Sequence, residues 1–392
     1  MKVLHIAASL SSKWGGPTRV IIGLTEALSK KGVKVSIFAP TAENEKGFLE
    51  KPEGVNIRLF RKSFPSKFWT SYSPGLAKAL REEAFDFDLF HIHEIWHHPH
   101  FAAYQAARFA RKCFVITIHG SLEPWCLNHK AFKKKIYSML IQRKILREAS
   151  ALHAITGEEV RNIAKFVGNK NVLLIPNGLN LEEFENFSYR EQIDELYPDI
   201  RGKKIILFLG RLHPKKGLDI LAKAFQLILK QRDDIQLLIV GPDSNGYKEE
   251  IVKILKAENA IVNVTFTGML RGDDKLAALS RADIFVLPSY SEGFSISILE
   301  AMACGLPVVV TKECNFPEVE EIGAGKVIDP DAGQLSEALI ELLENQELCK
   351  EMGKRGKRLI QQKYTWDKVA DKMIIAYEEI LAGQRVYAEG KR

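Results

Sequence analysis

Short, continuous apolar runs recur along this chain, and a helix-like segment follows almost every one of them. Runs that are apolar without alternation are typical of parallel strands, because both faces of such a sheet are covered. In the first half the runs are Val3–Ala7, Val33–Phe38, Leu89–His93, Phe114–Ile118, Ala151–Ala154 and Val172–Ile175. In the second half they are Ile205–Leu209, Ile235–Val240, Val264–Thr267, Ile284–Leu287 and Val308–Val310. Two successive series of strand and helix predict an α/β chain with two Rossmann-like, doubly wound parallel-sheet domains.

Length and composition agree with two globular domains. The chain has 392 residues, of which 46% are hydrophobic and 27% charged, and it can bury two cores of ordinary size. No apolar run approaches the roughly 20 residues that a membrane-spanning helix needs. The apolar start, Met1–Ser9, is interrupted by His5, so we interpret it as a buried strand and not as a signal peptide. The five cysteines form no Cys-x-x-Cys pair, which indicates reduced cysteines in a cytoplasmic protein.

The domain boundaries follow from one polar segment and from the end of the chain. The charged stretch around Glu182–Lys203 is the candidate linker, so we expect a first domain at residues 1–185 and a second at residues 186–365. Residues 366–392 would form an amphipathic helix and a tail.

Net charge is unevenly distributed between these halves. Residues 1–185 hold 27 Lys and Arg against 17 Asp and Glu, whereas the remainder holds 29 against 32. The basic first half predicts an anionic surface or substrate on that side, although charge that serves only solubility would look the same.

The segment between Glu292 and Glu300 carries the strongest chemical signal. It follows a strand-like run and opens a helix-like run, so backbone N–H groups from Gly293 onward would lie at a helix N-terminus, where phosphate binds. A carboxylate does not bind a diphosphate, so each flanking glutamate is expected to bind hydroxyl groups. This pattern predicts a nucleotide sugar, whose diphosphate has a hydroxyl-rich ring on either side.

A second basic loop follows the strand-like run Ile205–Leu209. Arg211 can grip two phosphate oxygens at once, and Lys216 supplies a compact positive charge. Taken alone the loop is most simply a solvated basic loop, but beside the Glu292–Glu300 segment it is expected to stabilise a leaving diphosphate. The loops Val240–Asp243 and Phe266–Leu270 end two further strands and give weaker support.

Taken together, these motifs make the chain resemble glycosyltransferase family 4, whose members have the GT-B fold. The resemblance rests on Gly210-Arg211 with Lys216-Gly217, on Glu292-Gly293-Phe294, on Glu300-Ala301-Met302-Ala303 with Gly305-Leu306-Pro307-Val308-Val309, and on Trp14-Gly15-Gly16 and Pro176-Asn177-Gly178. It implies two domains that face each other across a cleft, with the first on the acceptor side and the second on the donor side. It also implies that the C-terminal helix returns to the first domain.

The resemblance assigns roles to individual residues. It implies that Glu292 binds donor-sugar hydroxyls and Glu300 the ribose. Arg211 and Lys216 would hold the diphosphate together with backbone amides of Phe294 and Ser295. The full donor-binding set is Gly15, Gly16, Arg211, Lys216, Glu292, Gly293, Phe294, Ser295 and Glu300. The catalytic set is His119, Arg211, Lys216 and Glu292, in which His119 would lie near the donor sugar. The resemblance further implies retention of anomeric configuration and no metal or other cofactor.

A cluster of histidines lies in the first half of the chain. Its members are His91, His93, His97, His98, His100 and His119. On a strand, His91 and His93 would face the same way, so we considered a metal site. No Cys or His partners occur at metal-binding spacing, and the resemblance places this cluster on the acceptor side of the cleft.

A basic segment at residues 128–148 left two interpretations open. Phe132, Ile136, Tyr137 and Leu140 recur at helical spacing among lysines and arginines. The segment would either lie on an anionic membrane or pack against the core with a solvated basic face. No nucleic-acid motif accompanies it.

The motifs and the resemblance together imply a retaining transferase that moves a sugar from a UDP- or GDP-sugar to a hydroxyl of a glycan or lipid-linked acceptor. A role in cell-surface polysaccharide or glycolipid assembly follows from the resemblance, with the protein cytoplasmic and peripheral to the inner face of the membrane. The alternatives are a non-catalytic nucleotide-sugar binding protein and a nucleotide-sugar epimerase. A dehydrogenase is disfavoured because no Gly-x-Gly-x-x-Gly turn follows the first strand.

Overall fold

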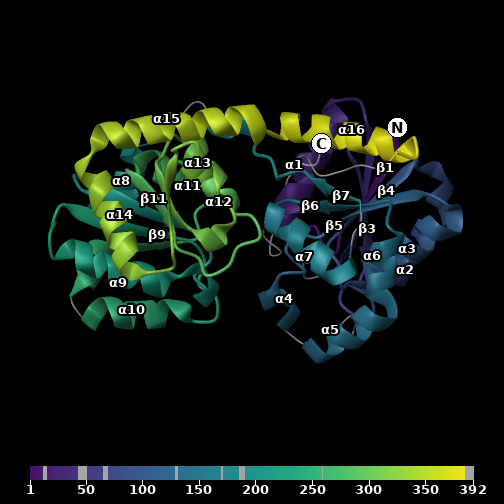
Figure 1. Cartoon of the computed structure of the whole chain (residues 1–392), viewed down its shortest axis with the longest axis horizontal. Helices are drawn as coiled ribbons and strands as arrows, with labels where there is room; N and C mark the ends of the chain where they lie inside the picture. The colour runs from purple at the N-terminus through teal and green to yellow at the C-terminus, as the bar shows by residue number, and fades with distance from the viewer. Residues whose placement is uncertain are drawn as a thin grey trace. The chain divides into compact units, whose positions relative to one another are not determined.

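The structure is a computed structural model that describes residues 1–11, 16–42, 51–64, 69–128, 131–168, 171–184, 190–257 and 259–384. The chain divides into two compact units (Figure 1). Unit 1 comprises Met1–Gly178 and Trp366–Arg392, and unit 2 comprises Leu179–Thr365.

Unit 1 is built on a parallel sheet of seven strands. Their order is β3-β2-β1-β4-β5-β6-β7. The strands are β1 (Lys2–Ile6), β2 (Lys34–Thr41), β3 (Asn56–Arg61), β4 (Leu89–His93), β5 (Cys113–Thr117), β6 (Ala151–Ala154) and β7 (Val172–Leu174). The helices are α1 (Gly16–Lys30), α2 (Pro74–Glu82), α3 (His98–Ala110), α4 (Pro124–Asn128), α5 (Ala131–Tyr137), the π-helix η3 (Ser138–Gln142), α6 (Arg143–Glu148), α7 (Gly157–Val167) and α16 (Trp366–Leu381), with the 3-10 helix η2 (Ala84–Asp86).

Two hydrophobic cores cover the faces of this sheet. Because neighbouring strand residues point to opposite faces, Val3 and Leu4 enter different cores. Helices α1 and α16 pack on the face of Val3, whereas α2, α3, α6 and α7 pack on the face of Leu4. Burial on both faces explains why the strands read as continuous apolar runs.

The C-terminal helix α16 packs against α1 in unit 1, as the resemblance implied. Its first residue, Trp366, lies so close to Gly23 that a Cβ atom there would come within 2.3 Å of the indole ring. A Cβ atom at Gly178 would likewise come within 2.6 Å of the same ring. The two glycines therefore make room for the tryptophan that begins the returning helix.

Unit 2 is built on a parallel sheet of six strands in the order β10-β9-β8-β11-β12-β13. The strands are β8 (Lys204–Leu209), β9 (Ile235–Val240), β10 (Val264–Gly268), β11 (Ile284–Leu287), β12 (Val308–Thr311) and β13 (Gly325–Ile328). The helices are α8 (Arg190–Leu196), α9 (Leu218–Leu229), α10 (Tyr247–Ala257), α11 (Gly272–Arg281), α12 (Ile296–Ala303), α13 (Glu318–Glu321), α14 (Ala332–Glu344) and α15 (Gln346–Lys363), with the 3-10 helices η4 (Leu181–Phe184), η5 (Pro198–Ile200), η6 (Pro214–Lys216), η7 (Ala260–Asn263) and η8 (Lys312–Cys314). This is the strand order of a Rossmann fold, with its switch point between β8 and β11.

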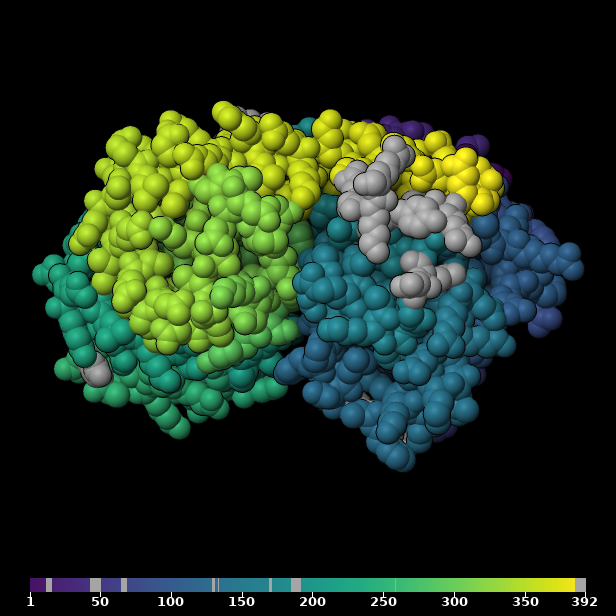
Figure 2. Space-filling view, viewed as in Figure 1, coloured from purple at the N-terminus to yellow at the C-terminus, as the bar shows by residue number. Residues whose placement is uncertain are grey.

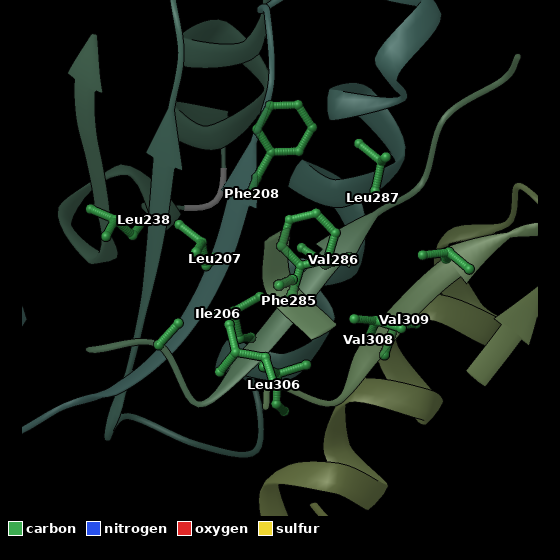
Figure 3. Close-up of a cluster of buried hydrophobic side chains, with 14 of the residues drawn as sticks. Ile206, Leu207, Phe208, Leu238, Phe285, Val286, Leu287, Leu306, Val308 and Val309 are labelled. Carbon is green, nitrogen blue, oxygen red and sulfur yellow. The ribbon is translucent and has the colours of Figure 1, made fainter. Parts of the chain in front are cut away.

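The core of unit 2 centres on these two middle strands. Phe208 of β8 and Phe285 of β11 are fully buried, and Figure 3 shows them among Leu207, Val286 and Leu287. The apolar middle strands fix the sheet and so position the loops that follow them.

Two strands and the linker differ from the sequence prediction. β3 and β13 lie at sheet edges and are only partly buried, so neither carries the continuous apolar run that marks an inner strand. The predicted linker Glu182–Lys203 is wrong, because the segment holds η4, α8 and η5 and packs into unit 2. Unit 1 ends at Gly178 and not at residue 185, since the amide of Leu179 donates to the carbonyl of Tyr364.

Candidate functional site

The candidate site lies in unit 2, at the carboxyl ends of β8 and β11. These neighbouring strands lie at the point where the strand order reverses, and ligands of open α/β sheets bind at such a point. The loops that follow them, residues 210–217 and 288–295, carry most of the residues that the sequence singled out. They are joined by a hydrogen bond of 2.8 Å from the amide of Tyr290 to the carbonyl of Lys215.

The loop after β8 is compact and closely packed. The side chain of His213 caps the 3-10 helix η6 by accepting a hydrogen bond of 3.1 Å from the amide of Lys215. Gly217 follows with φ +66°, and a Cβ atom there would lie 1.9 Å from the carbonyl oxygen of Pro288. Only glycine satisfies both the left-handed backbone and the close approach of the two loops.

The loop after β11 is held from its other side by β12 and the segment that follows it. The hydroxyl of Thr311 donates to the carbonyl of Ser289 at 2.6 Å. The amide of Glu292 donates to the carbonyl of Glu313 at 2.9 Å, and the side chain of Asn315 donates to the carbonyl of Glu292 at 2.7 Å. Glu292 is therefore presented on a fixed backbone.

Lys216 and Glu292 form an ion pair between the two loops. Lys216 Nζ lies 2.5 Å from Glu292 Oε1, and the side chains are only 17% and 10% exposed. The hydroxyl of Ser289 donates to the same carboxylate oxygen at 2.7 Å. The sequence assigned the lysine to a diphosphate and the glutamate to sugar hydroxyls, and the structure brings the two side chains together. An ammonium group has three donors, so this contact leaves others for a ligand.

Arg211 has a different setting from Lys216. It is exposed, and it makes no hydrogen bond or ion pair with any residue that the structure describes. The local field is positive, since burial and then the charges of Arg211, Lys215 and Lys216 lower the pKa of His213. An exposed guanidinium that no described residue neutralises can bind an anionic ligand with two parallel hydrogen bonds.

Helix α12 begins directly after the Glu292 loop. Ser295 is the N-cap residue, and its side chain forms no capping hydrogen bond to the helix. The first amides of the helix therefore keep donor capacity, and the helix dipole adds partial positive charge there. Phe294 packs beside Phe316 and Tyr364 and fixes the entry of the chain, with Gly293 half-buried before it.

Glu300 lies in the second turn of α12, on the buried side of the helix. Its Oε1 accepts a hydrogen bond of 2.8 Å from Lys275 Nζ of α11, and the two side chains are 8% and 11% exposed. A carboxylate has several acceptor positions, so one contact with lysine orients the group without exhausting it. Burial, followed by the charge of Glu300, raises the pKa of the neighbouring Cys304 thiol to about 12, which makes this cysteine unreactive.

The predicted residues of the first domain lie in unit 1. His119 follows β5 with φ +50°, and its Nε2 lies 3.1 Å from Nδ1 of His93. Gly16 begins α1, and no described atom lies within 4 Å of the position of a Cβ atom there. Gly15 lies outside the described residues.

His119 belongs to a hydrogen-bonded cluster that we call the histidine network. Its members are His5, His91, His93, Thr117, His119, His153 and Tyr377. Burial lowers the pKa of His5 and His119 to about 3 and that of His153 to about 4. It also places the pKa values of His91 and His93 well below the usual range. These imidazoles are therefore neutral at pH 7.

Three members of the network, His5, His91 and His93, have nitrogens within 4.8 Å of one another and so raise the question of a metal site. Both nitrogens of His91 are hydrogen-bonded to Tyr377 and Thr117, and both nitrogens of His93 to His5 and His119. The rings of His91 and His93 are stacked, with an interplanar angle of 20°, so their lone pairs do not converge on one point. The residues present fit a hydrogen-bonded network better than a metal centre.

Two Asp-x-Asp triplets also bear on metal binding. Asp86 and Asp88 precede β4 and lie at the amino end of the sheet, away from the functional loops, and Asp88 accepts a hydrogen bond from the amide of Lys2. In the second triplet, Asp329 pairs with Lys312, and Asp331 caps α14. Neither triplet lies in the loops after β8 and β11.

Sequence reasoning missed four residues that complete these arrangements. They are Ser289 and Lys275 in unit 2, and His5 and Tyr377 in unit 1. Each contacts a predicted residue from another strand or helix, so no local spacing could reveal it except for Ser289, which lies three residues before Glu292.

Comparison with known proteins assigns the chain to a family. The description "Glycosyltransferase Family 4" matches residues 14–183, and "Glycosyl transferases group 1" matches residues 190–359. A phosphatidyl-myo-inositol mannosyltransferase of Mycobacterium leprae is 28% identical over 388 residues, which covers 93% of each protein.

Solved structures agree in fold. Sucrose-phosphate synthase from Thermosynechococcus elongatus has a TM-score of 0.82 at 23% identity and covers 98% of this chain and 100% of that one. Anabaena Alr3699/HepE, solved in complex with UDP and glucose, has a TM-score of 0.79 at 18% identity and covers 97% of this chain and 100% of that one. The chain belongs to glycosyltransferase family 4 and is a glycosyltransferase of the GT-B fold.

Proposed function

We propose that the unit 2 site binds a UDP- or GDP-sugar and that the enzyme transfers the sugar to an acceptor hydroxyl with retention of configuration and without a metal. The observation that carries this proposal is the combination of Arg211, Lys216 and the start of α12 with two oriented carboxylates, Glu292 and Glu300. Positive groups for a diphosphate thus lie beside acceptors for hydroxyl groups. A relative described as a GDP-mannose-dependent mannosyltransferase, and the structure of Anabaena Alr3699/HepE in complex with UDP-glucose, support the same class of donor.

The leaving group determines what the site must do. Breaking the anomeric bond expels a nucleoside diphosphate and leaves positive character on the sugar. Arg211, Lys216 and the amides at the start of α12 would stabilise the departing charge, because they are positioned before the reaction begins. The same positive charges would replace a divalent cation, so we expect turnover in the presence of a chelator.

The two carboxylates would orient the donor. Glu300, held by Lys275, would accept hydrogen bonds from the ribose hydroxyls, and Glu292, held by Lys216 and Ser289, would accept them from the sugar. Attack on the same face, assisted by the departing phosphate, requires no protein nucleophile. The configuration of the product, read from the anomeric coupling constant by NMR, tests this point, and an inverted product would refute retention.

Binding experiments test the donor site directly. We expect a nucleoside diphosphate to bind the wild type by calorimetry, and Glu300→Ala or Lys216→Ala to weaken binding at least tenfold, on the scale of a charged hydrogen bond. Lys326→Ala, at a half-buried lysine of unit 2 outside the two loops, is the control. Binding without any sugar transfer would favour the alternative of a non-catalytic binding protein; that alternative and the epimerase find no support in the comparisons.

The acceptor side of the proposal concerns the surface of unit 1. Across α4, α5 and η3, five large apolar side chains are exposed: Trp125 52%, Phe132 76%, Ile136 42%, Met139 71% and Leu140 68%. We call these five residues the apolar ridge. In Figure 2 the blue atoms of this segment form the lower edge of unit 1. Polar Ser138 and Gln142 are buried, and Ile145 and Leu146 of the same segment enter the core of unit 1. The segment therefore packs on the core and also exposes an apolar surface.

We propose that the apolar ridge docks on an anionic membrane and brings the enzyme to a lipid-linked acceptor. Lys135, Arg143 and Lys144 are exposed on the same segment, and such basic residues are attracted to anionic lipids while apolar side chains enter the interface. No described helix is long and apolar enough to cross a membrane. Peripheral docking on the inner face of the membrane agrees with a glycolipid or surface-polysaccharide acceptor.

Vesicle flotation tests the docking proposal. We expect binding to vesicles that contain phosphatidylserine and weak binding to neutral vesicles. Phe132→Ser combined with Leu140→Ser should abolish flotation while activity on a soluble acceptor persists. Phe109→Ser, at a residue of α3 that is 53% exposed, is the matched control. Unchanged flotation of the double variant, or its conversion from a dimer to a monomer by light scattering, would overturn the assignment to a membrane.

A further inference from the structure

The histidine network places several polar side chains in the interior of unit 1, where their desolvation costs free energy. His5, His91, His93, Thr117 and His153 lie on one face of the unit 1 sheet, because strand register pairs His5 with His91, His93 with Thr117, and Thr117 with His153. These five side chains are at most 4% exposed, under α1 and α16. Buried polar groups destabilise a fold unless each has a hydrogen-bond partner. The partners therefore determine which nitrogen of each histidine carries the proton.

One branch of the network has a fixed direction. His153 Nε2 donates to the carbonyl of Ile175, which can only accept, so His153 Nδ1 accepts from the hydroxyl of Thr117 at 2.8 Å. Having donated its only proton, the threonine oxygen accepts from His91 Nε2 at 2.6 Å. His91 Nδ1 then accepts from the hydroxyl of Tyr377. Every member of this branch is satisfied in a single arrangement.

The second branch connects His5, His93 and His119. His5 Nδ1 lies 2.9 Å from His93 Nε2, and His93 Nδ1 lies 3.1 Å from His119 Nε2. Neutral imidazole has one donor and one acceptor nitrogen, so the protons in this branch all point toward His119 or all point toward His5.

The inner end of the branch decides between these two directions. His5 Nε2 is buried and has no partner. If the protons pointed toward His5, this atom would carry an orphaned N–H group, which is rare in protein interiors, whereas an unsatisfied acceptor is better tolerated. The protons therefore point outward: His5 Nδ1 donates to His93, His93 Nδ1 donates to His119, and His119 carries its proton on Nδ1.

We infer that His5 and His93 are positioning residues that lock His119 as the Nδ1–H tautomer, so that unit 1 offers a fixed N–H donor to a substrate oxygen. The substrate contact rests on the proposed function, whereas the tautomer does not. His119 is the half-buried member of the network, and its Nδ1 forms no hydrogen bond with a described residue. A fixed N–H needs no reorganisation when the substrate binds, which is the property of a preorganised donor.

The backbone around His119 agrees with a fixed orientation. His119 and Gly120 both adopt positive φ, at 50° and 72°. Glu159 holds the turn because its carboxylate accepts the amide of Gly120 and, at 2.7 Å, the amide of Ile155. A left-handed residue other than glycine is strained and persists where the surrounding structure imposes it.

NMR of protein labelled with ¹⁵N-histidine tests the tautomer without any substrate, because protonated and unprotonated ring nitrogens have distinct chemical shifts. We expect His119 to show a protonated Nδ1 and an unprotonated Nε2 in the wild type. His93→Leu should release the ring to the Nε2–H form that neutral imidazole prefers in water. His93→Gln should restore the Nδ1–H form, because its amide can accept from His5 and donate to His119. His153→Gln, in the other branch, should leave His119 unchanged.

Kinetics supply the second measurement. We expect His93→Leu to lower kcat about tenfold with KM nearly unchanged, and His93→Gln to recover most of the loss, on the scale of one hydrogen bond. A wild-type His119 protonated on Nε2, or a His119 tautomer that is the same in His93→Leu, would overturn the inference. Neither result would contradict the proposed donor site in unit 2. Conversely, a failure of nucleoside diphosphate to bind in calorimetry would contradict the donor site but not the tautomer assignment.

Discussion

Replacing Lys216 with methionine removes the positive partner of Glu292 while keeping a side chain of similar length. Glu292 would then be a charge that is 10% exposed, with the hydroxyl of Ser289 as its remaining donor. Removing one partner of a buried ion pair costs about 3–5 kcal/mol. Because Ser289 and some water remain, we expect the lower end, about 3 kcal/mol, which for a unit of this size corresponds to a decrease in Tm of roughly 6–12 °C.

A more exposed pair in the same unit provides the control. Lys326 Nζ lies 2.8 Å from Glu341 Oε1, but these side chains are 34% and 51% exposed. Solvent screens such a pair, so Lys326→Met should cost at most about 1 kcal/mol. The two variants remove the same chemical group from ion pairs of similar length that differ strongly in burial.

A double-mutant cycle isolates the pair itself. Lys216→Met, Glu292→Gln and the double variant are compared by chemical denaturation, and we expect the double variant to be about 2 kcal/mol more stable than additivity predicts. In activity assays Lys216→Met should lower kcat on the order of 100–1000-fold, the cost of one preorganised donor. Additivity within about 0.5 kcal/mol, or a loss of stability equal to that of Lys326→Met, would refute the reasoning.

Two further predictions concern backbone and pH. Gly217→Ala and Gly202→Ala both place a side chain at positive φ, but only at position 217 would the Cβ atom meet protein atoms. Gly217→Ala should therefore lower Tm and weaken nucleoside diphosphate binding, whereas Gly202→Ala should cost only about 1–2 kcal/mol of stability. Equal effects of both substitutions would contradict the close packing of the two loops. Burial lowers the pKa values of the histidines in the histidine network. Below about pH 6.5 the unfolded chain therefore binds more protons than the folded chain, and the free energy of unfolding should fall between pH 6.5 and 4. Glu94 and Glu159 act in the opposite direction, since burial raises their pKa to about 7, but they are fewer. Protection factors of unit 1 peptides, corrected for the pH dependence of intrinsic hydrogen exchange, should therefore be lower at pH 5 than at pH 7, and equal or higher values would contradict this sign.

The inner strands were predictable because burial on both faces leaves a continuous apolar run. β8 and β11 illustrate this, since Ile205–Leu209 and Ile284–Leu287 match the strands within one residue. The edge strand β3 mixes polar and apolar residues, and the edge strand β13 is short and only partly buried. Neither segment contains a continuous apolar run, so the sequence did not distinguish either of them from a loop. The edge strands β7 and β10 were nevertheless predicted, because Val172–Leu174 is wholly apolar and Val264–Thr267 combines apolar with β-branched residues. The residues of the strand, and not its place at an edge, therefore explain the difference.

The unit 2 site was predictable where chemistry follows a strand end. Arg211, Lys216 and Glu292 were identified from their loops, and strand order then brings these loops together. The pairing of Lys216 with Glu292 was not predictable, because these residues are 76 positions apart in sequence. They meet only because the loops after two neighbouring strands pack against each other. For the same reason His5 and Tyr377 could not be connected with His93 and His91.

The segment after α4 shows where helical periodicity misleads. Spacing alone predicted an apolar face but could not say whether that face pointed toward the core or toward solvent. The structure buries Ser138 and Gln142 and exposes Met139 and Leu140. Gln142 is buried because its Nε2 forms a hydrogen bond of 3.0 Å with Nε2 of His100. His100 is itself buried and requires a polar partner on the side of the segment that faces the core.

The most direct test of the central claim is nucleoside diphosphate release from UDP-, GDP- and ADP-sugars by the wild type and by Glu300→Ala, with a metal chelator present. The account predicts release from one donor that is insensitive to the chelator and at least ~100-fold slower in the variant. Release that the chelator abolishes, or equal rates in the wild type and the variant, would contradict a metal-independent donor site built around Arg211, Lys216, Glu292 and Glu300.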